Sequence, residues 1–221
     1  MPGPAGARPE PPRDVALPTL MRFAGAALEP HGDYDALHFL DADLAGQAAD
    51  DAVFLGCRLE RCGFDGASLR RARIAECRID ELRATSLDAA DSTWRDTLVG
   101  VRRVGALLAT GAAWSAVRVR GGRLDLLDLS GAKLHTVAFE GCSIGELDLG
   151  TVEARGLAFE DCRIDVLDVT GARLAGADLT GARIGAVRGV EGLRGAAITA
   201  AQLLDLAPAL AAHVGIRIRA D

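Results

Sequence analysis

Apolar residues recur at every fifth position from Phe39 to Ile184, with no break in register. An α-helix would bring apolar residues back at a spacing of about 3.6, and a half-buried strand at a spacing of about 2, so neither element explains the pattern. The residue two positions before each central residue is also usually small or apolar. The pattern predicts a backbone that turns once every five residues, with two side chains inside and three outside. The thirty central residues are Phe39, Leu44, Ala49, Phe54, Leu59, Phe64, Leu69, Ile74, Ile79, Ala84, Ala89, Trp94, Val99, Val104, Ala109, Trp114, Val119, Leu124, Leu129, Leu134, Phe139, Ile144, Leu149, Ala154, Phe159, Ile164, Val169, Leu174, Leu179 and Ile184.

Twenty residues make one full turn of the expected coil, because the side chains themselves repeat at that spacing. In rows of twenty, one column has leucine two positions before the centre at positions 87, 107, 127, 147 and 167. Another column has only small residues and one valine there, and the segment AFEGC at 138–142 returns as AFEDC at 158–162. The sequence therefore predicts a coil with four sides.

Two inward positions carry residues that do not fit a packed interior, Gln47 and Arg102. A buried, unpaired guanidinium would cost several kcal/mol. We therefore expect either a local bulge at Arg102 or a side chain that reaches outward to water.

Some five-residue segments resemble the Ala-(Asp/Asn)-Leu-X-X consensus of the pentapeptide-repeat family. The matching segments are Ala42-Asp43-Leu44, Ala177-Asp178-Leu179 and the looser Ala132-Lys133-Leu134 and Ala172-Arg173-Leu174. The resemblance implies an all-β solenoid, a right-handed quadrilateral β-helix. Residues 37–186 would form about 7.5 coils of it, stacked about 4.8 Å apart.

The segments outside the repeat have different expected roles. Residues 1–18 hold six of the eight prolines, which predicts a disordered tail, and residues 19–36 are expected to cap the first coil. A solenoid also needs a cap at its other end. Residues 187–221 are the expected C-terminal cap, with a helix at about 200–214 that begins with a Thr199–Gln202 capping box.

The composition limits the class of protein. A net charge of -6 and a pI near 5.3 argue against direct nucleic-acid binding. No apolar run is long enough to span a membrane and no basic-then-apolar leader is present, so we expect a cytoplasmic protein. The five cysteines all lie two positions before a central residue, which predicts reduced thiols in the core and neither a disulfide framework nor a metal site. They are Cys57, Cys62, Cys77, Cys142 and Cys162.

No motif in the chain points to catalysis or to a cofactor. The sequence has no Gly-x-Gly-x-x-Gly, no Walker A segment and no arrangement typical of a nucleophilic triad or a paired-carboxylate site. We therefore expect a non-catalytic binding protein with no metal, no cofactor and no enzyme activity.

The outward charges fall into columns. Seven acids are expected to form a file along one corner of the rod, next to a column of five arginines on the adjacent face. Two interpretations stay open, a solvated surface with weak ion pairs or a site for a partner. The acids are Asp65, Asp88, Asp125, Asp128, Asp148, Asp165 and Asp168, and the arginines are Arg83, Arg103, Arg123, Arg163 and Arg183.

The chain further resembles the quinolone-resistance members of the pentapeptide-repeat family in length and in its C-terminal helix. That resemblance implies a dimeric mimic of duplex DNA that binds DNA gyrase, a type II topoisomerase, and confers antibiotic resistance. The expected cap and dimer residues are Leu203, Leu206, Leu210 and Val214. Residues 37–186 carry 23 acids and 18 bases, a net of -5, and this mixed charge supports the alternative of a scaffold solenoid with an unrelated protein partner.

Overall fold

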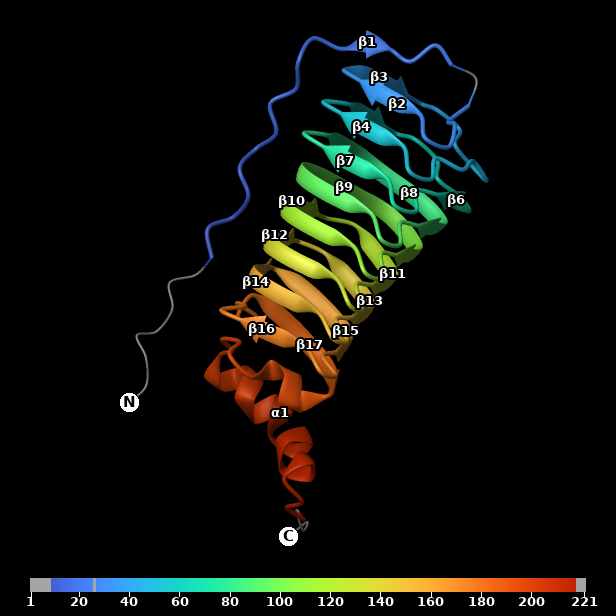
Figure 1. Cartoon of the computed structure of the whole chain (residues 1–221). Helices are drawn as coiled ribbons and strands as arrows, with labels where there is room; N and C mark the ends of the chain where they lie inside the picture. Colours follow the sequence, from blue (N-terminus) through green and yellow to red (C-terminus); the bar gives the residue numbers. More distant parts are fainter. Residues whose placement is uncertain (1–8, 26, 218–221) are drawn as a thin grey trace.

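A computed structural model shows the chain as a β-solenoid of about eight turns that ends in one C-terminal helix (Figure 1). The structure describes residues 9–25 and 27–217. Strands are β1 (Met21–Arg22), β2 (Asp33–Asp35), β3 (Leu37–Leu40), β4 (Val53–Leu55), β5 (Arg58–Glu60), β6 (Ala67–Ser68), β7 (Arg73–Ala75), β8 (Arg78–Asp88), β9 (Thr93–Leu108), β10 (Ala113–Arg120), β11 (Arg123–Asp128), β12 (Lys133–Glu140), β13 (Ser143–Asp148), β14 (Glu153–Glu160), β15 (Cys162–Asp168), β16 (Arg173–Ala175) and β17 (Ala182–Arg188). A 3-10 helix, η1 (Val190–Leu193), and an α-helix, α1 (Ala200–His213), follow.

The strands stack in parallel with a register of twenty residues, which confirms the four-sided coil. For example, β12 pairs with β14 so that Leu134 lies beside Ala154 and Phe139 beside Phe159. Each coil contributes one five-residue side to each of four faces. We name the faces, in chain order, the tryptophan face (centred on 94, 114 and 134), the strap face (99, 119 and 139), the arginine face (104, 124 and 144) and the aspartate face (109, 129 and 149).

The central residues form one continuous core. All of them are buried except Ile184, which is half-buried, and Tyr34 already takes the same inward register. Aromatic side chains stack from coil to coil: the ring centroids of Trp94 and Trp114 are 5.1 Å apart, as are those of Phe139 and Phe159. The fold therefore follows directly from the five-residue pattern.

The cysteines are buried and free, as the sequence predicts. Each thiol lies on the inside of a corner and can donate to a backbone carbonyl of the preceding coil. The Cys57 Sγ lies 3.2 Å from the Tyr34 carbonyl oxygen, and the Cys162 Sγ lies 3.3 Å from that of Phe139. Thr97 takes the same position, and its hydroxyl contacts the Ile74 carbonyl in the same way. A small side chain with a weak donor suits this corner.

A bulge at Arg102 confirms one prediction for the misfit positions. The pairing of β8 with β9 shifts register beside Leu82, so that Val101 takes the inward place and the Arg102 side chain is 63% exposed. In the next coil Gly122 has a positive φ, and a Cβ there would lie 2.3 Å from the Val101 carbonyl oxygen. Only glycine therefore accommodates the bulged backbone.

Gln47, the other misfit, is half-buried and joins the first coil to the segment before it. Its Oε1 accepts from the Leu28 N–H at 2.7 Å, and its Nε2 donates to the Asp43 carbonyl at 3.0 Å. At the same end β1 pairs with β3, and the Phe23 ring stacks on Phe39 with centroids 4.3 Å apart. These contacts cover the first coil.

The C-terminal cap begins with the predicted capping box. The Thr199 hydroxyl accepts from the Gln202 N–H, and the Thr199 N–H donates to Gln202 Oε1. The same glutamine amide donates to the carbonyls of Leu179 and Ala182, both at 2.7 Å, so it also satisfies the last coil. The helix α1 continues through Pro208 without being split.

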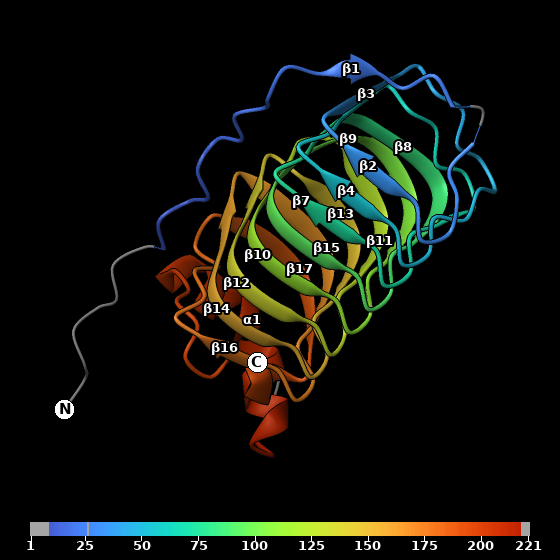
Figure 2. The ribbon, with the colours of Figure 1, turned by 45° about the horizontal axis from the view of Figure 1, so that its top comes forward.

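Residues 9–20, which we name the strap, run along the outside of the solenoid toward β1 (Figures 1 and 2). The expected disordered tail covers residues 1–18. Within it, Asp14 forms an ion pair with Arg118, and the Pro12 carbonyl accepts a hydrogen bond from the same guanidinium. Residues 1–8 lie outside the described part of the chain.

Candidate interaction surfaces

Three of the seven predicted acids form a ladder on the aspartate face. In the paired strands β11, β13 and β15, Asp128 lies beside Asp148, and Asp148 beside Asp168. We name these three residues the aspartate ladder. Neighbouring strands are about 4.8 Å apart, so three carboxylates follow one another at that spacing along the rod. Asp88 belongs to the same column but is separated from the ladder by Leu108.

Backbone hydrogen bonds hold the ladder carboxylates in place. Each accepts from the N–H two residues further on: Ser130 to Asp128 at 2.8 Å, Gly150 to Asp148 at 2.7 Å, and Thr170 to Asp168 at 2.9 Å. This is the Asx-turn arrangement that aspartate favours at a bend. The column therefore has a structural role at the corner of the coil as well as a charge.

The middle carboxylate of the ladder has a different acidity from its neighbours. Burial, together with the charges of Asp128 and Asp168, raises the pKa of Asp148. Hydrogen bonds from the Thr170 hydroxyl and N–H lower the pKa of Asp168. Burial opposes ionisation of Asp128, but hydrogen bonds from Ser130 and Thr110 lower its pKa overall.

Of the other four predicted acids, three form ion pairs with arginines and one accepts a backbone hydrogen bond. Asp125 lies 2.6 Å from Arg123 and 3.3 Å from Arg103, and Asp165 lies 2.8 Å from Arg163. Asp88 pairs with Arg70 at 2.9 Å, and Asp65 accepts from the Thr85 N–H at 2.6 Å.

The ladder differs from Asp88, Asp125 and Asp165 in its charge partners. Arg188 lies beside Asp168 in the pairing of β15 with β17, but its guanidinium pairs with Glu146 at 2.6 Å. Within residues 9–25 and 27–217, the three ladder carboxylates form no ion pair with a basic side chain at 4.0 Å or less. The predicted seven-member file therefore divides into three ion-paired acids, Asp88, Asp125 and Asp165, the hydrogen-bonded Asp65, and the aspartate ladder.

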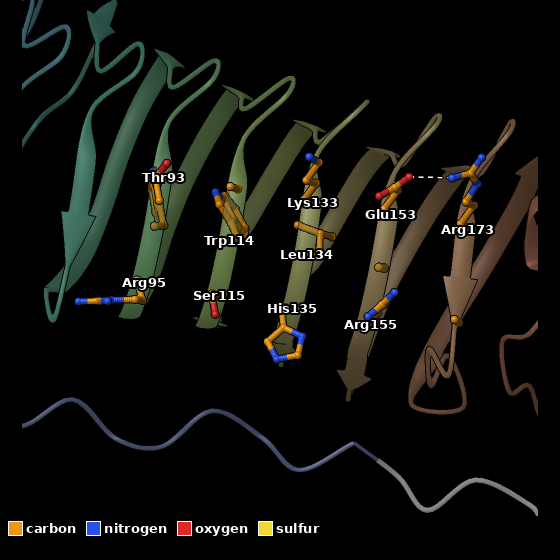
Figure 3. Close-up of a pocket in the computed structure, with 14 residues that line it drawn as sticks. Thr93, Arg95, Trp114, Ser115, Lys133, Leu134, His135, Glu153, Arg155 and Arg173 are labelled. Carbon is orange, nitrogen blue, oxygen red and sulfur yellow. Dashed lines mark hydrogen bonds and ion pairs between the residues drawn. The ribbon is translucent and has the colours of Figure 1, made fainter.

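A cationic hollow on the tryptophan face was not predicted from the sequence. Its volume is about 500 Å³, and Glu153 forms an ion pair with Arg173 at 2.8 Å in it (Figure 3). The charged or titratable residues around it are Arg95, Lys133, His135, Glu153, Arg155 and Arg173. The basic residues alternate between the two edges of the face, so no single column of the repeat contains them. Grouping outward residues by face would have found this surface.

The C-terminal helix presents an apolar surface, but not with all the residues predicted. Leu206 is 5% exposed and Leu210 half-buried, so Leu206 belongs to the cap. Leu203 and Val214 are exposed, and Leu204, which the prediction omits, is 75% exposed. The missed leucine follows directly on Leu203, so a wider apolar stripe along the helix was the available signal.

No group of three or more His, Cys, Asp and Glu side chains is placed to hold a metal ion within the described residues. In the same part of the chain, no helix has the length and apolar character needed to cross a membrane.

Comparisons with known proteins give only distant matches. No protein-family model matches the chain, and no curated protein matches it. Among solved structures, full-length QnrB1, a plasmid-mediated fluoroquinolone resistance protein, is 15% identical, with 86% of this chain and 96% of that chain covered and a TM-score of 0.33. HetL, a pentapeptide repeat protein involved in heterocyst differentiation regulation from the cyanobacterium Nostoc, is 17% identical, with 76% and 87% covered and a TM-score of 0.32. By the register of its own strands, this chain has the architecture of a pentapeptide-repeat β-solenoid.

Proposed function

We propose that this protein is a non-catalytic binding protein that uses the aspartate ladder to recognise a cationic surface of a protein partner. The observation that carries the proposal is the ladder itself: three carboxylates in register on three paired strands, with no ion-pair partner among the described residues. Because the backbone fixes each carboxylate, little side-chain entropy would be lost on binding. A partner cation would also relieve the repulsion among the three charges.

The partner we propose is the DNA-binding surface of a type II topoisomerase, DNA gyrase. Such a surface is cationic because it must neutralise phosphates, and a row of fixed carboxylates could occupy it by the same electrostatics. The resemblance of the sequence to quinolone-resistance members of the pentapeptide-repeat family supports this choice. The alternative, a scaffold for an unrelated partner, is favoured by the cationic hollow, because a pure DNA mimic has no use for it.

We propose further that two chains pair end to end through α1. Leu203, Leu204 and Val214 expose apolar area at the end of the rod, more than the cap needs. Multi-angle light scattering should give twice the chain mass of 23.0 kDa, and Leu204→Asp should give the mass of one chain. A single-chain mass for the unchanged protein at about 50 μM would contradict the pairing.

The functional proposal is tested by inhibition of gyrase-catalysed supercoiling and by protection of gyrase from a quinolone. The decisive variant is Asp128→Asn, Asp148→Asn, Asp168→Asn, because asparagine can accept the same backbone hydrogen bonds without charge. The matched control changes three exposed aspartates away from the ladder, Asp33→Asn, Asp161→Asn, Asp205→Asn.

We expect the unchanged protein and the control to inhibit supercoiling at micromolar concentration. The ladder variant should need at least tenfold more protein for the same inhibition. No inhibition by the unchanged protein would exclude gyrase as the partner and leave the scaffold alternative. Equal inhibition by all three proteins would show that the ladder carboxylates do not contribute to binding gyrase.

A further inference from the structure

The strap lies over one column of the strap face. The outward positions of this column in four successive coils are Leu98, Arg118, Ala138 and Ala158, which lie side by side in β9, β10, β12 and β14. All four are buried, although the register points them away from the core. Pro9 and Pro11 line a hollow of about 300 Å³ with Ala138 and Ala158. The two small alanines leave room for the strap prolines beside them. We name the column of Leu98, Arg118, Ala138 and Ala158 the strap groove.

Arg118 supplies the polar recognition in this groove. It is 8% exposed, and its guanidinium donates from Nη2 to the Pro12 carbonyl and from Nη1 to Asp14 Oδ1 at 3.1 Å. On the solenoid side its Nε lies 3.2 Å from Glu140 Oε1, an ion pair without a hydrogen bond, since within the described residues this buried Nε has no hydrogen-bond partner. Arg120 adds a second cation 3.8 Å from Asp14. One fixed guanidinium thus contacts a backbone carbonyl and a carboxylate two residues apart.

A proline-rich segment suits such a groove for a physical reason. Prolines hold the chain extended and lack the N–H that would be left unpaired against an apolar wall. Its carbonyls remain free to accept from a buried donor such as Arg118. At the other end of the strap Pro18 approaches Gly56 so closely that a Cβ at 56 would lie 3.1 Å from the proline ring.

We propose that the strap groove is a docking site for extended, proline-rich protein segments that carry a carboxylate two residues after a proline, and that the chain's own Pro12–Asp14 occupies it in cis. Attachment to the same chain gives the strap an effective concentration of the order of millimolar. An external segment would therefore bind only when it outcompetes the strap or when the strap is released. This second binding surface is independent of the aspartate ladder.

The test uses the full chain and a fluorescein-labelled peptide of residues 9–20 as the probe, with binding measured by fluorescence anisotropy. Asp14→Arg places a cation beside Arg118 and Arg120, which should release the strap and open the groove. Glu10→Arg is the matched control, since it makes the same charge change on the strap and Glu10 has no ion pair among the described residues. The variant Asp14→Arg, Arg118→Ala has an open groove without its guanidinium.

We expect Asp14→Arg to bind the peptide at least tenfold more tightly than the unchanged chain and the control, and the double variant to lose that gain. Equal binding by all four proteins, or undiminished binding by the double variant, would overturn the proposal. Circular dichroism and thermal unfolding establish that each variant is folded. A mass of two chains for the unchanged protein that falls to one on addition of excess peptide would instead assign the groove to the strap of a second copy, which would overturn occupation in cis.

Discussion

Ala112 stands where the preceding coil has Ser92, and this difference leaves one indole N–H without a partner in the described part of the chain. The Ser92 hydroxyl accepts from Trp94 Nε1 at 2.9 Å and donates to the Ala89 carbonyl at 2.6 Å. Trp114 stacks on Trp94, but within the described residues its buried Nε1 has no hydrogen-bond partner. We predict that Ala112→Ser stabilises the protein.

The magnitude follows from the geometry of the two coils. A buried donor left unpaired costs about 1–3 kcal/mol. The Ala112 N–H already bonds to the Ala109 carbonyl at 3.1 Å, as the Ser92 N–H does to Ala89 at 3.2 Å, so a hydroxyl at 112 finds the same surroundings. After the cost of burying that hydroxyl, we expect a gain of about 1 kcal/mol, or a rise in Tm of about 2–4 °C.

Thermal and urea unfolding of three variants separate this effect from a general effect of serine. Ala132→Ser is the matched control, because it changes the same column one coil further on, where Leu134 has no indole. Ser92→Ala should lower the stability by about 1–3 kcal/mol, since it leaves Trp94 unpaired. If Ala112→Ser changes the Tm no more than Ala132→Ser does, the reasoning about the indole is wrong.

Three further changes test other parts of the structure. Asp148→Asn should stabilise the protein by about 0.2–1 kcal/mol at pH 7. Because the pKa of Asp148 is raised in the folded state, the stability that its carboxyl contributes below pH 3.8 is lost as the pH rises through the folded-state pKa. The advantage of the variant in urea unfolding should therefore vanish at low pH. Phe159→Ala should cost about 3–5 kcal/mol in the same assay because it empties a stacked core position; a cost below about 1 kcal/mol would contradict the packing. Gln202→Ala should cost about 1–2 kcal/mol by uncapping both α1 and the last coil, and retention of the full Tm would refute that double role.

The sequence predicts the core because the inward positions follow from the five-residue spacing alone. The five-residue spacing places Trp94 and Phe139 inside without any knowledge of their neighbours, and the same spacing exposes Arg102 as a residue that must leave the interior. The capping box at Thr199 is also local, since its two hydrogen bonds join residues three apart.

The strap and the charge pairing depend on contacts that no local pattern contains. Asp14 and Arg118 are 104 residues apart, so the composition of the proline-rich segment, which is typical of a disordered tail, gives no sign of their hydrogen bond. The acids look equivalent in a column, yet Asp125 has two arginines beside it while Asp148 has none within 4.0 Å among the described residues. Whether an arginine contacts a given aspartate depends on how far its side chain extends, which the spacing of the repeat does not give.

We propose that the aspartate ladder recognises a cationic DNA-binding surface. The most direct test of this proposal is displacement of a labelled DNA duplex from gyrase by this protein, followed by fluorescence anisotropy at two salt concentrations. We predict that the unchanged protein displaces the duplex, less well at the higher salt, and that Asp128→Asn, Asp148→Asn, Asp168→Asn needs at least tenfold more protein. Displacement by the ladder variant at the same concentration as the unchanged protein would contradict the claim.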